Sequence, residues 1–341
     1  MKVKMVEVAR KLGISKATVS LAVNGKPGVN EQTREKIFQC IEEMEKAEES
    51  APESSTSKPV APLRIIKVVI INHRKQVVCD PELDLWSQVL RTFDVEARKR
   101  GYLYGLTYLN EKEENLQEII DECNLDIVAG IILFGTEMSS VDYNIIHQIH
   151  KPLVIYDYEM PDGSYSSVCI DNARAVEIAC NLFKKTGIDD ICYFSTNKDV
   201  YNFAKRRDAF QNILWKYGDI SGENKIIPLG NSIEEITEKA VLYLNNHKLP
   251  EACIFENYQI SIGVLTAVQR LKIAVPEKIK LVGIDEIPDY IVPDIKLTQI
   301  RIPHSERAEM AMDLLDREIR NSFRTKIKVF AVPELIKGQT A

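Results

Sequence analysis

The stretch VEVARKLGISKATVSLAVNG, residues 6–25, has the apolar spacing of two short helices joined by a turn. Within each half the apolar residues recur on one helical face: Val8, Ala9 and Leu12 in the first, Val19 and Val23 in the second. Gly13 breaks the first helix, Ser15 can cap the second, and Gly25 tolerates the left-handed conformation that ends it. The spacing predicts a helix-turn-helix.

A third helix is predicted to follow VNEQTREK, residues 29–36, where Asn30 is a suitable N-cap. Ile37, Ile41 and Met44 repeat at positions i, i+4 and i+7 of one helical face. Three such helices can close a small apolar core. We therefore expect an all-α head over residues 1–46.

In a helix-turn-helix that binds DNA, the N-terminal end of the second helix enters the major groove. Lys16 and Ala17 would then face base edges, and Leu21 would lie against the groove one turn later. Side chains suited to phosphate contact also cluster here: Ser15, Thr18, Ser20, Asn24 and Arg34. On helix spacing alone, a helical hairpin with a few capping hydroxyls fits equally well.

Charge is unevenly distributed along the 341 residues. The net charge of −6 argues against non-specific nucleic-acid binding. Residues 1–46 carry +3, residues 47–62 carry −2 and the remainder carries −7. The sequence therefore predicts a mildly basic head and an acidic body.

No apolar run approaches the ~20 residues that a membrane span needs, and the N-terminus lacks a signal-peptide core. The cytoplasm is therefore the expected compartment, with no membrane partner. The seven cysteines form no Cys-x-x-Cys pair and indicate neither a disulfide framework nor a zinc site: Cys40, Cys79, Cys123, Cys169, Cys180, Cys192 and Cys253. We expect no metal and no cofactor.

From residue 63 onward, short apolar strands alternate with amphipathic helices. Strands are predicted at RIIKVVII (64–71), YLYGLTYL (102–109), IVAGIILF (127–134), PLVIYDY (152–158), ICYFS (191–195), ACIF (252–255) and IKLVGID (279–285). This alternation predicts parallel sheets wrapped by helices, and the length of chain favours two lobes. We expect an N-lobe of about 63–160 and 290–322, and a C-lobe of about 161–289 and 323–341.

Ligands of such α/β folds bind at the carboxyl ends of the strands, in a cleft between lobes. Polar residues at predicted strand ends are therefore candidate ligand contacts: Asn72, Asp157, Asp171, Ser195, Asn257 and Asp285. Arg206 joins them, because it lies near the start of a predicted helix just past the ICYFS strand.

Residues 6–44 resemble the DNA-binding head of the lactose-repressor/galactose-repressor family of bacterial transcription regulators. The matching positions are Val8-Ala9, Gly13, Ser15, Ala17-Thr18-Val19-Ser20, Asn24, Val29 and Thr33-Arg34. The body is similar to the two-lobed, periplasmic-binding-protein-like core of that family through ARKRGY (97–102), RRDAF (206–210) and LVGIDEIP (281–288). The resemblance implies a homodimeric regulator, most simply a repressor of a carbohydrate-related operon, that binds double-stranded, pseudo-palindromic operator DNA and a small-molecule effector such as a sugar.

By this resemblance, Arg206, Asn257 and Asp285 fall where family members hydrogen-bond effector hydroxyls. A guanidinium and a carboxylate can each hold adjacent hydroxyls. Further candidates are an aromatic side chain that can stack on a sugar and two more strand-end acids: Trp86, Asp157 and Asp171. The alternatives are helix capping or turn formation for the acids and a surface ion pair, for example with Asp208, for Arg206.

The sequence departs from the family pattern after the ACIF strand, where Asn257-Tyr258 replaces a common Asn-Asp. The candidate site thereby has one carboxylate fewer and a tyrosine in its place. The effector class therefore stays open, and a ligand other than a simple sugar fits this change.

A second departure is EKAEESAPESSTSKPVAP, residues 45–62. The family resemblance implies a hinge helix here, whose leucine wedges into the minor groove and kinks the duplex. This segment has no leucine, and its prolines, Pro52, Pro59 and Pro62, oppose a helix. We expect an atypical, flexible linker over residues 47–62.

Two other classes of protein compete with a regulator. An enzyme would need a motif that is missing, since no Gly-x-Gly-x-x-Gly, P-loop or Gly-x-Ser-x-Gly run follows a strand. His147 and His150 lie at i, i+3 but lack an accompanying acid in a recognised metal motif. The other alternative is a sugar-like-ligand-binding protein with lost or weak DNA binding, which the atypical linker keeps open.

Overall fold

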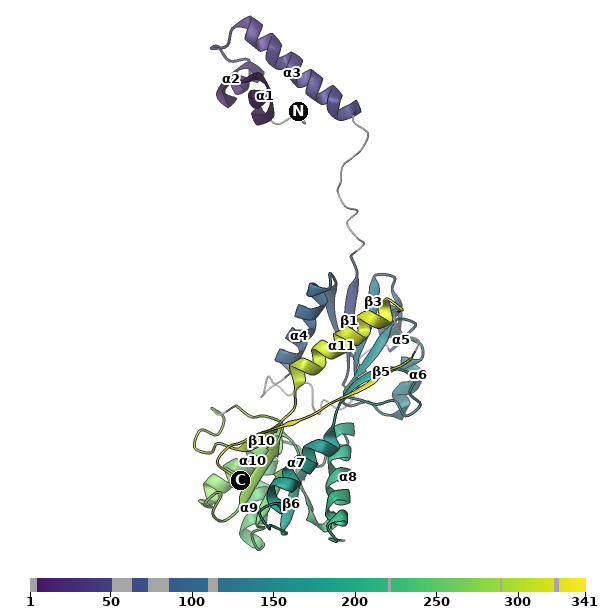
Figure 1. The fold of residues 1–341 in the computed structure, drawn as a ribbon, viewed down its shortest axis with the longest axis vertical. Coiled ribbons are helices and arrows are strands. Elements are labelled where there is room, and N and C mark those ends of the chain that lie inside the picture. Colours follow the sequence, from purple (N-terminus) through teal and green to yellow (C-terminus); the bar gives the residue numbers. More distant parts are fainter. Residues whose placement is uncertain are drawn as a thin grey trace. The chain divides into compact units, whose positions relative to one another are not determined.

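The computed structural model describes residues 5–50, 63–72, 86–109, 116–219, 222–288, 290–321 and 325–341. The chain divides into two compact units, Met1–Ala61 and Pro62–Ala341 (Figure 1). The first unit is helical and the second combines helices with two sheets. None of the helices in the described ranges is long and apolar enough to cross a membrane.

Three helices build the small unit: α1 (Met5–Leu12), α2 (Lys16–Val23) and α3 (Glu31–Ser50). They share a buried core of Val8, Ala9, Val19, Ala22, Ile37, Cys40 and Ile41. The predicted caps are confirmed, because Ser15 Oγ accepts from the backbone N–H of Thr18 (3.1 Å) and Asn30 Oδ1 accepts from that of Thr33 (2.8 Å). The three-helix head expected from the sequence is therefore present.

Helix α3 continues through Ser50, beyond the predicted end of the head at residue 46. Residues 47–50 thus belong to a helix rather than to the linker predicted over 47–62. Alanine and glutamate favour helices, and the first proline of the segment is Pro52. The rest of the predicted linker, residues 51–62, lies outside the described residues.

The first lobe of the large unit contains a six-stranded parallel sheet in the order β11-β5-β4-β3-β1-β2. The strands are β1 (Ile65–Ile71), β2 (Leu103–Leu109), β3 (Val128–Phe134), β4 (Leu153–Tyr156), β5 (Ser166–Ile170) and β11 (Lys328–Ala331). Its helices are α4 (Ser87–Lys99), α5 (Leu116–Asn124), η1 (Ser140–Asp142), α6 (Tyr143–Ile146) and α11 (His304–Ile319). Strand β1 lies between β2 and β3, with Val68 opposite Leu106 of β2 on one side and Ile132 of β3 on the other.

The second lobe contains a six-stranded sheet in the order β12-β10-β9-β8-β6-β7, in which only β12 runs antiparallel to its neighbour. The strands are β6 (Ile191–Thr196), β7 (Ile226–Gly230), β8 (Ala252–Phe255), β9 (Lys280–Ile284), β10 (Thr298–Arg301) and β12 (Glu334–Ile336). Its helices are α7 (Asn172–Lys184), α8 (Tyr201–Lys216), η2 (Gly222–Lys225), α9 (Ile233–Asn246) and α10 (Tyr258–Leu271). The expected two-lobed α/β core is confirmed.

The chain passes between the two sheets three times: after β5, after β10, and between β11 and β12 (Figure 1). The predicted lobe boundaries near residues 160, 290 and 322 are therefore wrong by one strand each. Strands β5 and β11 belong to the first sheet, and β10 belongs to the second. Each of these strands is a short, partly apolar run, and such a run pairs equally well with either sheet.

The segment VDYNIIHQIH, residues 141–150, has amphipathic spacing that predicts a helix, but the helix in the structure is much shorter. It consists of the 3-10 turn η1 and the single turn α6, which ends at Ile146. Ile145, Ile146 and Ile149 are buried in the first lobe. A compact turn is therefore enough to bury the apolar residues whose spacing predicted a helix.

Candidate functional site

Asp157 and Asp285 occupy matching places in the two lobes. Asp157 follows β4 in the first sheet, and Asp285 follows β9 in the second. Both have left-handed backbones, with φ of 69° and 71°, a conformation that aspartate tolerates better than most residues. Their backbone N–H groups donate to the next strand, to Val168 O (3.0 Å) and Ile300 O (3.1 Å). Both carboxylates thereby stand at the carboxyl ends of their sheets.

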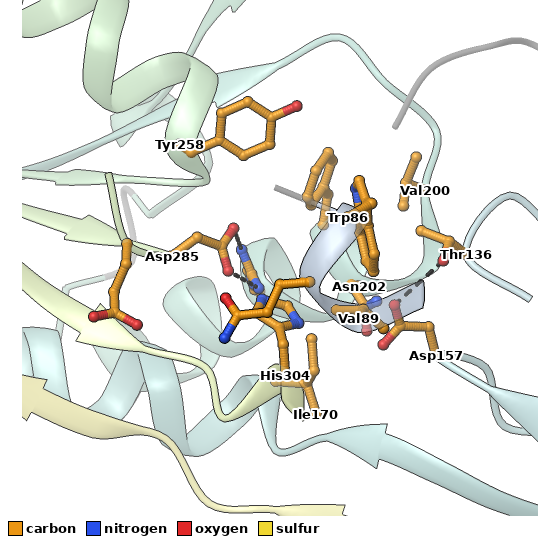
Figure 2. A pocket seen from close by; sticks show the side chains of 14 residues that line it. Trp86, Val89, Thr136, Asp157, Ile170, Val200, Asn202, Tyr258, Asp285 and His304 are labelled. Carbon is orange, nitrogen blue, oxygen red and sulfur yellow. Dashed lines mark hydrogen bonds and ion pairs between the residues drawn. The ribbon is translucent and has the colours of Figure 1, made fainter. Parts of the chain in front are cut away.

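A cavity of about 140 Å³ lies between these strand ends and is lined by both lobes (Figure 2). The first lobe contributes Trp86, Thr136, Asp157 and His304, and the second contributes Asn202, Phe203, Arg206, Tyr258, Asp285 and Glu286. Cavities of roughly 150 Å³ hold a single benzene ring, so this one suits a small ring compound. Four predicted effector contacts line it: Trp86, Asp157, Arg206 and Asp285.

Arg206 is the most heavily bonded group of the cavity wall, and only 1% of it is exposed. Its Nη1 and Nη2 donate to Asp285 Oδ2 (3.1 Å) and Oδ1 (3.2 Å), a bidentate ion pair seen in Figure 2. Nη1 also donates to the backbone oxygen of Glu256 (2.6 Å), and Nε donates to Asn172 Oδ1 (3.0 Å). The surface ion pair considered from the sequence, with Asp208, is not formed among the described residues.

The Nε contact of Arg206 sets the orientation of two amides behind the cavity. A guanidinium only donates, so Asn172 must turn its oxygen toward Arg206. The amide nitrogen of Asn172 then donates to Asn202 Oδ1 (2.8 Å). Asn202, which lines the cavity, is left with its own amide nitrogen as the group available to a ligand.

Asp157 has an arginine partner as well. The carboxylate binds Arg307, a fully buried residue of α11 whose guanidinium lies over the Tyr156 ring at 4.3 Å. The other oxygen of Asp157 accepts from the Thr136 hydroxyl (3.2 Å), as Figure 2 shows. Each lobe thus places one aspartate on the cavity and one buried arginine against it.

His304 begins α11 and reaches the cavity beside Trp86, with ring centroids 5.6 Å apart. Arg307 Nη1 lies 3.3 Å from His304 Nδ1. Since arginine only donates, Nδ1 is the acceptor, and neutral His304 carries its proton on Nε2. Burial, followed by repulsion from Arg307, lowers the pKa of His304 to about 4, so the ring is uncharged near neutral pH.

Four candidate ligand contacts named from the sequence do not line the cavity: Asn72, Asp171, Ser195 and Asn257. Two of them cap helices. Asp171 caps α7 by accepting from the backbone N–H of Arg174 (2.9 Å), which is the capping alternative raised from the sequence. Asn257 caps α10 in the same way, through the backbone N–H of Ile260 (3.0 Å). In both cases the first turn of a helix takes up the side-chain oxygen. Tyr258, the residue after Asn257, lines the cavity instead.

Sequence reasoning missed Asn202, His304, Thr136 and Glu286. Asn202 and His304 lie in the first turns of helices, and Glu286 lies in a loop, where no strand-end signal marks them. Position was the available signal for the other two, since Thr136 closely follows the strand predicted over residues 127–134 and Glu286 directly follows the predicted Asp285. In the described parts of the chain, no group of three or more His, Cys, Asp or Glu side chains is placed to hold a metal ion.

In the head, Lys16 and Ala17 are exposed in the first turn of α2, and Leu21 is half-buried one turn later. The predicted phosphate contacts Ser15 and Thr18 share a hydrogen bond of 2.8 Å between their hydroxyls. These residues stand together at one end of α2.

The other two phosphate candidates on α2 are also joined to each other. Asn24 Nδ2 donates to the backbone oxygen of Ser20 (2.8 Å) and approaches its hydroxyl (3.3 Å). Their side chains therefore help to end the helix.

Arg34 has a different environment from the one expected. Its Nη1 donates to the backbone oxygen of Ala22 (3.3 Å), and its Nη2 donates to that of Lys26 (3.0 Å). The guanidinium therefore ties α3 to the end of α2 and the following turn. This contact gives Arg34 a positioning role within the head, and its phosphate contact stays a prediction.

Two family profiles match the chain. The profile "Bacterial regulatory proteins, lacI family" matches residues 4–45, and that of the periplasmic binding protein-like domain matches residues 181–341. The head and core are thus those of a transcription regulator with a periplasmic-binding-protein-like domain. The chain belongs to the lactose-repressor/galactose-repressor (LacI/GalR) family.

Relatives span nearly the whole chain. The HTH-type transcriptional regulator GalS of Salmonella typhimurium is 26% identical over 314 residues, which cover 90% of this chain and 87% of GalS. The HTH-type transcriptional repressor CytR of Escherichia coli K12 is 25% identical over 316 residues, covering 91% and 88%. These relatives are transcription regulators rather than enzymes.

Solved structures share the fold. The CelR–cellobiose complex matches with a TM-score of 0.69 at 16% identity and covers 100% of both chains. The lac repressor dimer bound to operator and the anti-inducer ONPF matches with a TM-score of 0.63 at 17% identity, covering 100% of this chain and 99% of that one.

Proposed function

We propose that this protein is a ligand-responsive, DNA-binding transcription regulator, a repressor of a carbohydrate-related operon. The observation that carries the proposal is that one chain joins an exposed helix end, Lys16-Ala17 on α2, to a cavity lined by two lobes. The names of the relatives support it, since GalS is a transcriptional regulator and CytR a transcriptional repressor. The carbohydrate link is supported by CelR, whose structure holds cellobiose. The proposed site of action is the cytoplasm.

A homodimer on a pseudo-palindromic operator completes the proposal. The first lobe exposes apolar side chains along α4 and the edge strand β2: Val95, Leu103, Leu106 and Tyr108. Exposed apolar side chains of this kind suit a symmetric contact with a second copy. Analytical ultracentrifugation should show a dimer, and Leu106→Glu should convert it to a monomer; a wild-type monomer at micromolar concentration would contradict this interface.

Effector binding between the lobes would alter their relative angle and so the spacing of the two heads. Residues 51–62 contain no leucine that could wedge into the minor groove, and three prolines interrupt the segment. We therefore expect weak coupling through this segment, modest operator affinity and little DNA bending. Circular-permutation gel shifts test this, and a strong central kink would contradict it.

The decisive experiment is a footprint of the purified protein on DNA from the region of its own gene. A protected pseudo-palindrome supports a regulator, whereas ligand binding without any protected site supports the alternative, a sugar-binding protein without DNA binding. Lys16→Ala should change base preference as well as affinity, because lysine can donate to guanine acceptors. If the Lys16→Ala variant loses the same affinity for every DNA sequence, Lys16 does not read bases.

A further inference from the structure

The charges around the cavity are already balanced, apart from one acid. Asp285 is neutralised by Arg206, and Asp157 by Arg307, so neither guanidinium is available to pair with a charged ligand. The third carboxylate, Glu286, is exposed at the cavity edge and forms no ion pair with the described residues. Among the residues that the structure describes, the cavity therefore has no uncompensated positive charge.

The cation whose charge acts on Glu286 is also occupied. Arg301 pairs with Glu306 (3.1 Å) and Glu334 (3.4 Å). Burial raises the pKa of Glu286, but protonation would only bring the cavity to neutrality. His304 is uncharged near neutral pH, as derived above. A phosphate or carboxylate in this cavity would find no unpaired cation among the described residues.

The neutral polar groups are, by contrast, arranged for hydrogen bonds of both kinds. Asn202 must present its amide nitrogen, because its oxygen accepts from Asn172. His304 must present Nε2–H, because its Nδ1 faces Arg307. Asp157 and Asp285 retain acceptor capacity beside their arginine contacts, since each carboxylate oxygen has two lone pairs. A ligand with hydroxyl groups can satisfy donors and acceptors together.

Apart from Gln88 and Thr136, the remaining wall is aromatic and apolar. Trp86, Phe203 and Tyr258 line the cavity together with Val89 and Val200. Aromatic faces favour the apolar face of a ring compound.

We infer that the cavity takes an uncharged, polyhydroxylated ring compound, oriented by donation from Asn202 and His304, and rejects phosphorylated or carboxylated forms of the same compound. This inference rests on the proposed function of the cavity as the effector site. It narrows that function to neutral effectors.

The test uses the full-length protein and matched pairs of compounds, with thermal shift first and calorimetry on every hit. The pairs are glucose and glucose 6-phosphate, galactose and galactose 1-phosphate, and ribose and ribose 5-phosphate. We expect the neutral member of a pair to stabilise the protein and the phosphorylated member to bind at least ~10-fold more weakly. A phosphorylated member that binds as tightly as its parent, or more tightly, overturns the inference.

Two variants sharpen the result. Asn202→Asp replaces the donor by a charge and should weaken the neutral ligand by at least ~10-fold. Asn212→Asp, on the exposed side of the same helix, is the matched control and should bind like the wild type. Glu286→Gln should narrow the affinity gap between neutral and phosphorylated partners; an unchanged gap contradicts the charge argument even if Asn202→Asp fails to fold.

The same samples separate this inference from the proposed function. If a phosphorylated compound binds tightly and the operator footprint is normal, the preference for uncharged ligands is contradicted, whereas the proposed regulator function is still supported. If only neutral compounds bind and no operator footprint is found, the preference for uncharged ligands is supported and the proposed regulator function is contradicted.

Discussion

Arg206 and Asp285 hold each other in a bidentate ion pair, with both nitrogen–oxygen distances close to 3 Å: 3.1 Å for Nη1–Oδ2 and 3.2 Å for Nη2–Oδ1. The same guanidinium orients Asn172 and binds the backbone of Glu256. Arg206 is therefore a structural centre of the second lobe as well as part of the cavity wall.

The first prediction concerns this pair. Arg206→Ala and Asp285→Asn should each lower the free energy of unfolding by about 3–5 kcal/mol, because each leaves a charge without its partner. The double variant should cost less than the sum of the two. Urea unfolding measures all three, with Asp208→Asn, exposed on the same helix, as the control within about 0.5 kcal/mol of wild type. Additive losses would show that the two charges do not act as a unit.

The second prediction concerns Arg34. Arg34→Ala removes two hydrogen bonds that tie α3 to the end of α2, so the turn at residues 24–28 should lose protection. Hydrogen-exchange mass spectrometry of the full-length protein should show at least ~5-fold faster exchange there, corresponding to about 1 kcal/mol. Lys16→Ala, an exposed change on α2, is the control and should leave exchange unaltered. If the Arg34→Ala variant keeps the wild-type exchange protection at residues 24–28, the two hydrogen bonds do not stabilise this turn, and phosphate binding is the role left for Arg34.

The third prediction is a pH dependence from His304. Folding lowers its pKa from an ordinary value near 6.5 to about 4, so between these values the unfolded chain binds more protons and stability falls as the pH falls. The contribution of His304 to the free energy of unfolding is complete above about pH 6.5 and declines as the pH falls to 4. Between pH 7 and pH 5 the protonation of His304 should lower the free energy of unfolding by about 2 kcal/mol.

Urea unfolding of wild type and His304→Phe at the two pH values measures this contribution as a difference. Glu256, whose pKa is raised by burial, acts in the opposite sense, but it is common to both proteins and cancels. The control is His247→Gln, a change at an exposed histidine. Its free energy of unfolding should fall between pH 7 and pH 5 by as much as that of wild type. An identical loss in His304→Phe would show that His304 does not carry the effect.

The fourth prediction concerns a contact between the lobes. The start of α8, in the second lobe, packs into the first: Phe203 joins its buried cluster, and the Tyr201 ring lies 4.8 Å from that of Tyr158. The Tyr201 hydroxyl donates to Glu159 (3.3 Å), which is also held by Lys328 (2.6 Å). This contact stabilises the arrangement in which both lobes line the cavity.

Tyr201→Phe keeps the ring and removes the hydrogen bond. A ligand that contacts both lobes should bind about 3- to 10-fold more weakly, because the two-lobed arrangement is less populated. Calorimetry with a neutral compound found by thermal shift measures the change. Tyr290→Phe, a change at a highly exposed tyrosine, is the control, and equal affinities in all three proteins would exclude a role for the Tyr201 hydroxyl.

The sequence predicts much of the fold because the buried strands β1 and β3 are continuous apolar runs. IIKVVII and VAGIILF are buried almost throughout, as strands covered on both faces must be. Which sheet β5, β10 and β11 join depends on pairing between segments far apart in the chain. Local periodicity carries no such information.

The site was predictable where a residue follows a clear strand. Asp157 and Asp285 end their strands and line the cavity, whereas Asn257, at the end of β8, turns back to cap a helix. The choice between capping and ligand contact depends on side-chain rotamers rather than on position. His304 and Asn202 acquire their roles only through partners on other elements, Arg307 and Asn172.

The three passages between the lobes are tied to one another. The backbone N–H of Asp171 in the first donates to Ala331 in the third (3.0 Å), and Arg301 at the second pairs with Glu334 at the third (3.4 Å). Three linked segments bend less easily within their common plane than they twist about their length. We therefore expect motion of one lobe relative to the other to proceed mainly as a rotation about these segments. The connection would then set the direction of the movement, and a ligand its extent.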